Sequence, residues 1–170
     1  MLNKKRIAIL LGDPSGIGPE IVSKLLCEKI IDNANILVIG ERKILEEGEN
    51  ISGKKGNFKF VNNSKDIVFD DETKFFLDIS KGTNRTYKYG QVSAESGASV
   101  LEAMDEAMDL ANNKKIDAVN FGPMNKSSLI MGGCPYNDEH DYFQKKLKMK
   151  DFCCEFNVID NFWTARVTSH

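Results

Sequence analysis

The fold at the start of this chain is decided by residues 12–21, Gly12-Asp13-Pro14-Ser15-Gly16-Ile17-Gly18-Pro19-Glu20-Ile21. An apolar run at residues 7–11 leads into this stretch, and apolar residues at helical spacing follow it as far as Ile30. Glycines allow positive φ and close approach of the backbone, and Pro19 has the fixed φ suited to the first residue of a helix. The stretch therefore predicts a strand, a tight loop and a helix.

The function of this loop has two interpretations. The free N–H groups at the start of the helix could bind an anion. However, the spacing G-x-x-x-G-x-G differs from the dinucleotide fingerprint G-x-G-x-x-G, and no Lys-Ser or Lys-Thr pair follows the last glycine as in a P-loop. Asp13 would also repel a phosphate. The loop is therefore equally compatible with a compact turn that binds no ligand.

Composition narrows the class of protein. The chain has 170 residues, of which 41% are hydrophobic, enough for one ordinary globular core. The formal net charge of −2 and the lack of a Lys/Arg tract give no reason to expect a nucleic acid or a membrane surface as partner. No apolar run approaches the length of a membrane span, and the basic N-terminus leads into a loop instead of a cleavage site. We therefore expect a cytoplasmic protein.

Four cysteines raise the question of disulfides or zinc. They are Cys27, Cys134, Cys153 and Cys154. Adjacent cysteines on a strand point to opposite faces, and nothing marks the chain as secreted, so we expect reduced thiols. The close-set ligand pairs of a Cys/His zinc site are missing from the sequence.

The remaining elements follow from periodicity. A continuous apolar run at residues 35–40 predicts a parallel strand, which completes a βαβ unit. Apolar residues at three- and four-residue steps predict a long helix at residues 93–112. Other predicted helices cover residues 42–47 and 125–131; predicted strands cover residues 58–61, 67–69, 75–79 and 116–121, and a hairpin of 152–159 and 162–168 turns at Asp160-Asn161.

Four stretches together carry a resemblance to a known family. They are Gly12 through Glu20, Gly90-Gln91 through Glu95-Ser96-Gly97, Gly122-Pro123-Met124-Asn125-Lys126, and Val167-Thr168-Ser169-His170. In this order and spacing the chain resembles, along its whole length, the 4-hydroxythreonine-4-phosphate dehydrogenase family of vitamin B6 biosynthesis.

The resemblance implies a fold and a domain organisation. The expected fold is α/β, a three-layer α/β/α arrangement with a mixed, largely parallel sheet, similar to isocitrate and isopropylmalate dehydrogenases. Residues 1–128 would form an N-terminal α/β domain, and residues 129–170 would begin a second α/β domain. Because proteins of this family are considerably longer, both the fold and the second domain are expected to be truncated here.

The resemblance also implies an activity. The family oxidises and then decarboxylates a phosphorylated 3-hydroxy amino acid, with NAD or NADP and a divalent metal (zinc, magnesium or cobalt), in a homodimer whose active site lies at the subunit interface. Because the nucleotide-binding residues would lie beyond residue 170, we expect this chain to be inactive by itself. Two alternatives remain: a dehydrogenase of another phosphorylated hydroxyacid, such as a four-carbon sugar acid phosphate, and a non-catalytic truncated remnant.

Four residues are candidates for the site. By family position, His170 would bind the metal, although an ordinary histidine at a chain end is the simpler interpretation without the resemblance. His140 and Asp141 fall in a segment that usually reads Gly-His-Thr-Glu and contacts the substrate; Asp141 replaces the threonine, which leaves the exact substrate open. Lys126 follows the end of a predicted strand, where α/β proteins place ligand groups. We assign it to the catalytic site with no particular role; a solvated surface lysine is the alternative.

Overall fold

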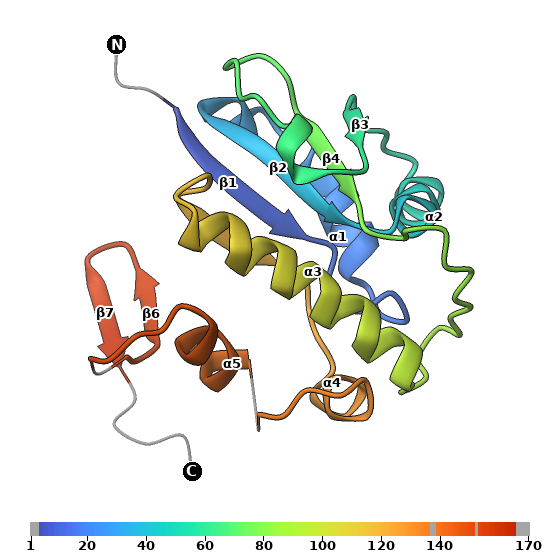
Figure 1. Cartoon of the computed structure of the whole chain (residues 1–170). Coiled ribbons are helices and arrows are strands. Elements are labelled where there is room, and N and C mark those ends of the chain that lie inside the picture. The colour runs from blue at the N-terminus through green and yellow to red at the C-terminus, as the bar shows by residue number, and fades with distance from the viewer. Residues whose placement is uncertain (1–3, 137–138, 152, 166–170) are drawn as a thin grey trace.

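The architecture is that of a parallel sheet between two layers of helices. A computed structural model describes residues 4–136, 139–151 and 153–165. The five strands of the central sheet lie in the order β3-β4-β2-β1-β5, and every pairing between them is parallel (Figure 1). Their bounds are β1 Lys5–Leu10, β2 Ala34–Gly40, β3 Lys59–Val61, β4 Phe75–Asp78 and β5 Ala118–Phe121.

Helices cover both faces of this sheet. Helix α3 crosses in front of the sheet in Figure 1, and α1 lies behind it and packs against α2. The helices are α1 Gly18–Leu25, α2 Arg42–Ser52, α3 Ala94–Asn112, α4 Lys126–Met131 and α5 Glu139–Lys146, with short 3-10 turns at η1 Lys29–Asn33 and η2 Ser64–Asp66. The predicted three-layer α/β/α fold with a largely parallel sheet is confirmed; among the residues that the structure describes, antiparallel pairing occurs only in the separate hairpin of β6 Phe156–Ile159 and β7 Phe162–Ala165.

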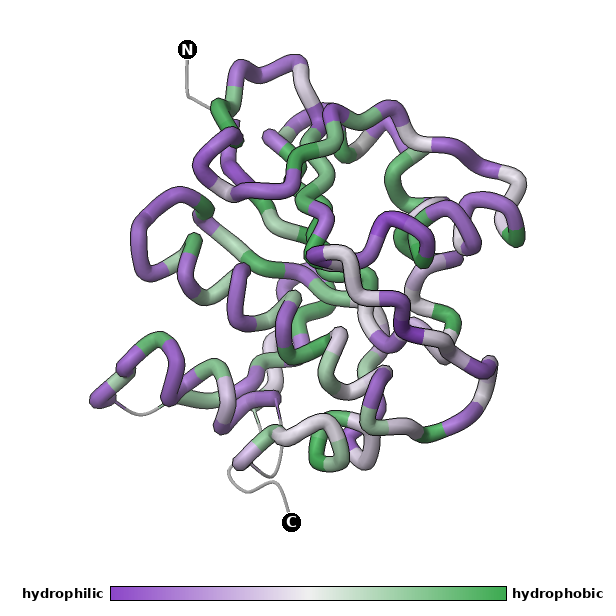
Figure 2. Tube along the Cα trace, turned by 45° about the vertical axis from the view of Figure 1, so that its right-hand side comes forward, coloured by the Kyte–Doolittle hydropathy of each residue, from purple (hydrophilic) through white to green (hydrophobic). Residues whose placement is uncertain are grey.

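The core is divided by the sheet into two apolar clusters. Successive strand residues point to opposite faces, so Leu10 packs on the α3 side and Ile9 on the side of α1 and α2. Buried residues of α3, such as Met104, join the first cluster, as the periodicity of that helix predicted. Figure 2 shows the same arrangement, with apolar stretches through the middle of the molecule and mostly hydrophilic outer loops. Among the described residues, no helix combines the length and apolar character needed to cross a membrane.

Some predicted elements are wrong or have other bounds. Residues 67–69 form no strand; Ile67 and Phe69 pack against the core from a loop. Helix α1 begins one residue before Pro19 and ends at Leu25, and residue 30 belongs to η1. Helix α2 extends beyond residue 47 to Ser52, and the left-handed Gly53 follows it. The hairpin turn at residues 160–161 is confirmed, and its first strand begins at Phe156, later than predicted; residues 152 and 166–168 lie outside the described part.

The backbone requires a glycine at only some of the glycine positions that follow β1. Gly12 has a φ of +80°, and a Cβ there would lie 2.6 Å from the carbonyl oxygen of Pro123. At Gly18 a Cβ would lie 2.2 Å from the carbonyl oxygen of Leu11. Gly16 has a negative φ and only an ordinary contact, 3.4 Å from the Asp13 carbonyl oxygen. Gly16 therefore has neither the positive φ nor the close approach that would require a glycine, whereas Gly18 has the close approach.

Candidate active site

The candidate site is built where parallel strands end. We call residues 11–17, between β1 and α1, the first loop, and residues 122–125, between β5 and α4, the second loop. The Asp13 amide donates to the Pro123 carbonyl oxygen at 2.9 Å, and the Gly122 amide donates to the Leu10 carbonyl oxygen at 2.9 Å. Two of the quoted motifs therefore lie side by side at the carboxyl edge of the sheet, where open α/β sheets bind ligands.

Asp13 stabilises the first loop from within. Its side chain is buried, and Oδ1 accepts a hydrogen bond from the Ser15 amide at 2.7 Å. An aspartate that accepts from an amide two residues on forms an Asx turn. The geometry therefore explains this aspartate as part of the turn, which is the second of the two interpretations given above for the loop.

A third motif reaches the same place through buried hydroxyl groups. Ser15 Oγ lies 2.7 Å from Ser96 Oγ, which accepts a hydrogen bond from Ser93 Oγ at 3.0 Å. The Gly90 amide donates to the Ser15 carbonyl oxygen at 2.8 Å. The motif at residues 90–97 is thus joined to the first loop, and the start of α3 is anchored at the carboxyl edge.

Helix α4, which carries Lys126, is held against α3 by two glycines. A Cβ on Gly97 would lie 1.7 Å from the Ser128 carbonyl oxygen, and one on Gly132 would lie 2.4 Å from the Ala98 amide nitrogen. Asn125 caps α4 by accepting from the Ser128 amide at 2.9 Å. Because the two backbones are in direct contact, the position of α4 is fixed relative to α3.

Lys126 lies beside the helix that carries two more of the four predicted site residues, His140 and Asp141. Lys126 is the first residue of α4, its side chain is 58% exposed, and its Nζ lies 3.9 Å from Oε2 of Glu139. Glu139 is the first residue of α5, and His140 and Asp141 follow it in the first turn of that helix. The fourth residue, His170, lies outside the described residues.

Sequence reasoning missed a buried polar cluster beside the first loop. Glu41 directly follows β2, and its Oε1 accepts hydrogen bonds from Arg85 Nη1 at 3.1 Å and from the Tyr87 hydroxyl. Arg85 also pairs with Glu102 on α3. Burial, reinforced by the bond to Glu41, raises the pKa of Tyr87 well above its usual value, and the bond to Glu102 raises the pKa of Arg85. A glutamate immediately after a buried strand was the one local signal that could have indicated this cluster.

The residues described here do not form a metal centre by themselves. No group of three or more His, Cys, Asp or Glu side chains in residues 4–136, 139–151 and 153–165 could hold a metal ion. A catalytic zinc site needs about three protein ligands. The divalent metal expected from the sequence therefore does not fit a site made from this part of the chain alone.

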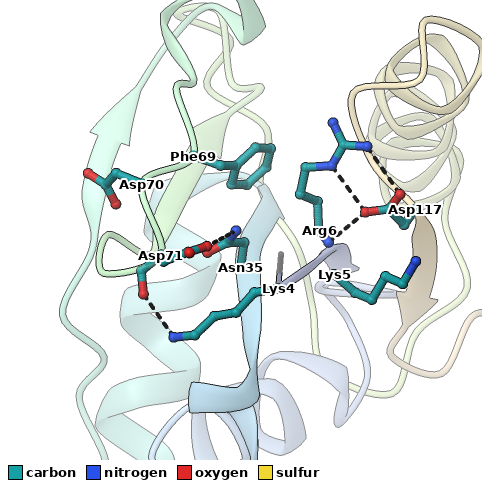
Figure 3. A pocket seen from close by; sticks show the side chains of 8 residues that line it. All are labelled: Lys4, Lys5, Arg6, Asn35, Phe69, Asp70, Asp71 and Asp117. Atoms are coloured by element: carbon teal, nitrogen blue, oxygen red, sulfur yellow. Dashed lines mark hydrogen bonds and ion pairs between the residues drawn. The ribbon is translucent and has the colours of Figure 1, made fainter. Parts of the chain in front are cut away.

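A pocket at the opposite edge of the sheet has a different character. It has a volume of about 530 Å³ and lies where β1, β2 and β5 begin (Figure 3). Arg6 forms an ion pair with Asp117, whose pKa falls to about 2 chiefly because of the hydrogen bond from the Arg6 side chain. Lys4 Nζ donates to the Asp71 carbonyl oxygen at 2.9 Å, and the Asp71 carboxylate accepts from Asn35. The pocket lies away from the motifs at the carboxyl edge, and its one ion pair among the described residues joins Arg6 to Asp117.

Comparisons with known proteins agree on one family. The family model described as "Pyridoxal phosphate biosynthetic protein PdxA" matches residues 32–170. A relative from Pasteurella multocida named as a 4-hydroxythreonine-4-phosphate dehydrogenase is 36% identical, over 99% of this chain and 51% of the relative. A Fusobacterium nucleatum relative named as a D-threonate 4-phosphate dehydrogenase is 30% identical, over 98% of this chain and 50% of the relative.

A solved structure shows the same fold. The crystal structure of a 4-hydroxythreonine-4-phosphate dehydrogenase from Burkholderia phymatum superposes with a TM-score of 0.80 at 27% identity, over 97% of this chain and 50% of that one. This chain therefore spans about half the length of the relatives that it matches.

Proposed function

Because this chain belongs to the family of the pyridoxal phosphate biosynthetic protein PdxA, we propose that it forms the N-terminal half of a dehydrogenase for a phosphorylated hydroxyacid. The observation that carries this proposal is the convergence of three family motifs, which are separate in the sequence, at the carboxyl edge of one parallel sheet. Ligands of open α/β proteins bind at this edge.

Lys126, His140 and Asp141 supply the substrate contacts in this proposal. An exposed lysine ammonium binds phosphate or carboxylate as a point charge, and Lys126 lies beside the first turn of α5. Glu139 competes for the same ammonium, so an anionic substrate must displace it. Asp141 adds a second negative charge near the site and thereby selects against substrates that place an anionic group there.

Nicotinamide and metal belong to the complete enzyme in this proposal. NAD or NADP would accept a hydride from the substrate carbinol carbon. We propose that His170 contributes one metal ligand and that the other ligands come from the remaining half or from a second subunit. The described residues lack a group of three or more His, Cys, Asp or Glu side chains that could hold the ion.

Residues 129–170 begin a second domain in this proposal. Within the described part of the chain, β6 and β7 pair only with each other. Their eight residues are exposed, including Ile159 at 71%, Phe162 at 68% and Trp163 at 64%. An isolated two-stranded hairpin is marginally stable in water. Further polypeptide of the complete enzyme, in a homodimer, would cover this apolar surface and complete the active site; the cytoplasm is the compartment we propose.

A complementation experiment tests the proposed function. The 170-residue chain is co-expressed with the second half of the Pasteurella multocida relative, and nicotinamide reduction is measured with NAD or NADP, divalent metal, and either 4-hydroxythreonine 4-phosphate or D-threonate 4-phosphate. We expect turnover from the pair and none from the chain alone. Preference between the two substrates identifies the reaction, since both names occur among the relatives. A pair that associates but reduces no nicotinamide with either substrate favours the non-catalytic remnant.

Two substitutions separate the proposed roles in an active pair. His140→Ala should weaken substrate binding and leave metal content near normal, because the expected partner of His140 is the substrate. His170→Ala should lower metal content, because one ligand of about three is lost. Metal analysis and steady-state kinetics on both variants decide. Loss of metal from His140→Ala with retention in His170→Ala would show that the two roles are reversed.

A further inference from the structure

One buried carboxylate oxygen beside the first loop lacks a partner. Among the described residues, one buried side-chain nitrogen or oxygen atom has no hydrogen-bond partner, and it is Oε2 of Glu41. Glu41 is 1% exposed, and the hydrogen bonds that its side chain accepts from Arg85 and Tyr87 both go to the other oxygen, Oε1. Buried polar atoms of native proteins almost always have a partner, which is often an ordered water molecule.

The space next to Glu41 has the right size for such a molecule. A small cavity with a volume of about 10 Å³ lies between the end of β2, the first loop and α3. That is close to the room needed by one water molecule. The residues around it that carry polar side chains are Glu41 and Ser99; Gly12 and Gly40 add main-chain groups, and the other lining residues are apolar.

We propose that Glu41 Oε2 binds a single internal water molecule, which links the end of β2 to the first loop. The water donates one hydrogen to Oε2 and shares its remaining hydrogen bonds with the Ser99 hydroxyl and the neighbouring main chain. Three or so partners are typical for an internal water, and Ser99, Gly12 and Gly40 line the cavity together with Glu41. The site is independent of any substrate or cofactor.

The charge and shape of the cavity favour water over a cation. The Glu41 carboxylate already has a cationic partner, since Arg85 Nη1 lies 3.1 Å from Oε1. A hard cation requires about six oxygen ligands, whereas Leu11, Ile44 and Ala103 form apolar parts of this wall. One water molecule needs fewer partners and adds no charge.

The bound water gives Glu41 a positioning role. Oε1 holds Arg85 and Tyr87 of the segment between β4 and α3, and the Gly90 amide of the same segment donates to the first loop at Ser15. Through Oε2 and the water, Glu41 would contact the first loop from the side of β2 as well. The loop is then fixed from two directions at the carboxyl edge of the sheet.

A high-resolution crystal structure of the 170-residue chain tests the proposal, together with NMR cross-relaxation between bound water and the Gly12 and Gly40 amides. We expect a density peak within hydrogen-bond distance of Oε2 and a long-lived water signal at these amides. Glu102→Gln is the matched control, because it removes the other carboxylate partner of Arg85 and should keep both signals. Glu41→Leu should lose both.

Several results would overturn the proposal. One is an empty cavity in the native crystal; another is a direct bond from a protein donor to Oε2. A third is a peak with an anomalous signal after a rubidium soak, which would identify a monovalent cation. If Glu41→Leu fails to fold, the native density and the Glu102→Gln control still decide, because neither depends on that variant.

Discussion

Lys126 Nζ lies 3.9 Å from Oε2 of Glu139, so the first residue of α4 forms an ion pair with the first residue of α5. The two side chains are 58% and 28% exposed, and solvent therefore screens the attraction. The significance of the pair is mainly geometric. It shows that the turn that carries His140 and Asp141 lies beside the lysine, which the linear order of these residues did not reveal.

A double-mutant cycle should measure a weak coupling between Lys126 and Glu139. For Lys126→Met, Glu139→Gln and the double variant, we expect a coupling free energy of about 0.2–1 kcal/mol, as for other exposed pairs. Chemical denaturation at low and high salt gives the four free energies of unfolding. The coupling should shrink in high salt; a value well above this range that resists salt would mean that the pair is shielded from solvent.

The two glycines of the first motif should differ in their tolerance of a side chain. Gly18→Ala should lower the free energy of unfolding by about 1–3 kcal/mol, because its Cβ would lie 2.2 Å from the Leu11 carbonyl oxygen, which belongs to the backbone. Gly16→Ala is the matched control and should change stability little, since its nearest contact is 3.4 Å and its φ is not positive. Equal losses in both variants would contradict this difference.

The sequence was informative wherever local periodicity and the fold agree. Apolar residues recur every three or four positions through residues 93–112, and this segment forms α3. The apolar run at residues 35–40 lies in the central strand β2. The prediction at residues 67–69 failed because Ile67 and Phe69 alternate as strand residues do, yet they cover the core from a loop. Periodicity reports which side chains are buried and does not distinguish a strand from an extended loop.

The candidate site was predictable only in part, for a similar reason. The strand-end position of Lys126 follows from a local pattern and the parallel topology. The cluster of Glu41 with Arg85 and Glu102 joins residues far apart in the sequence, and no spacing rule connects them. The ion pair between Lys126 and Glu139 likewise depends on how α5 returns to α4.

The ion pair of Arg6 and Asp117 should make stability depend on acid. Asp117 Oδ2 accepts from the Arg6 Nε at 3.0 Å and from the Arg6 amide at 2.8 Å, and its pKa is lowered to about 2. Because an unfolded aspartate has a pKa of about 3.9, the stabilisation is present above that value and is lost as the pH falls toward 2. The melting temperature of Asp117→Asn should therefore approach that of the native chain between about pH 5 and about pH 2.

Arg6→Met provides the control for this pH dependence. It removes the side-chain donors that lower the pKa of Asp117, so its melting temperature should likewise converge on that of the native chain in acid. A gap between the native chain and Asp117→Asn that widens as the pH falls would show that the stabilising species is the protonated carboxyl group.

The hydroxyl of Tyr142 should contribute more to stability than an exposed hydroxyl with the same chemistry. Tyr142 is 2% exposed, and its hydroxyl donates to Asp105 Oδ1 of α3 at 2.5 Å, so this bond attaches α5 to α3. Burial is the main cause that raises the pKa of this tyrosine far above its usual value, so the hydroxyl remains a donor at every ordinary pH. Tyr142→Phe should lower the free energy of unfolding by about 1–2 kcal/mol, because a bond to a charged acceptor is lost.

Tyr89→Phe is the matched control, since its hydroxyl donates to Glu47 at 2.9 Å but the residue is 61% exposed. Water replaces that lost bond, and we expect little change. Lys146 also pairs with Asp105, so the carboxylate keeps a partner in Tyr142→Phe and the measured loss reflects the tyrosine hydroxyl. Chemical denaturation of both variants gives the comparison. Equal losses in the two would mean that burial of the Tyr142 hydroxyl adds nothing to the strength of its bond to Asp105.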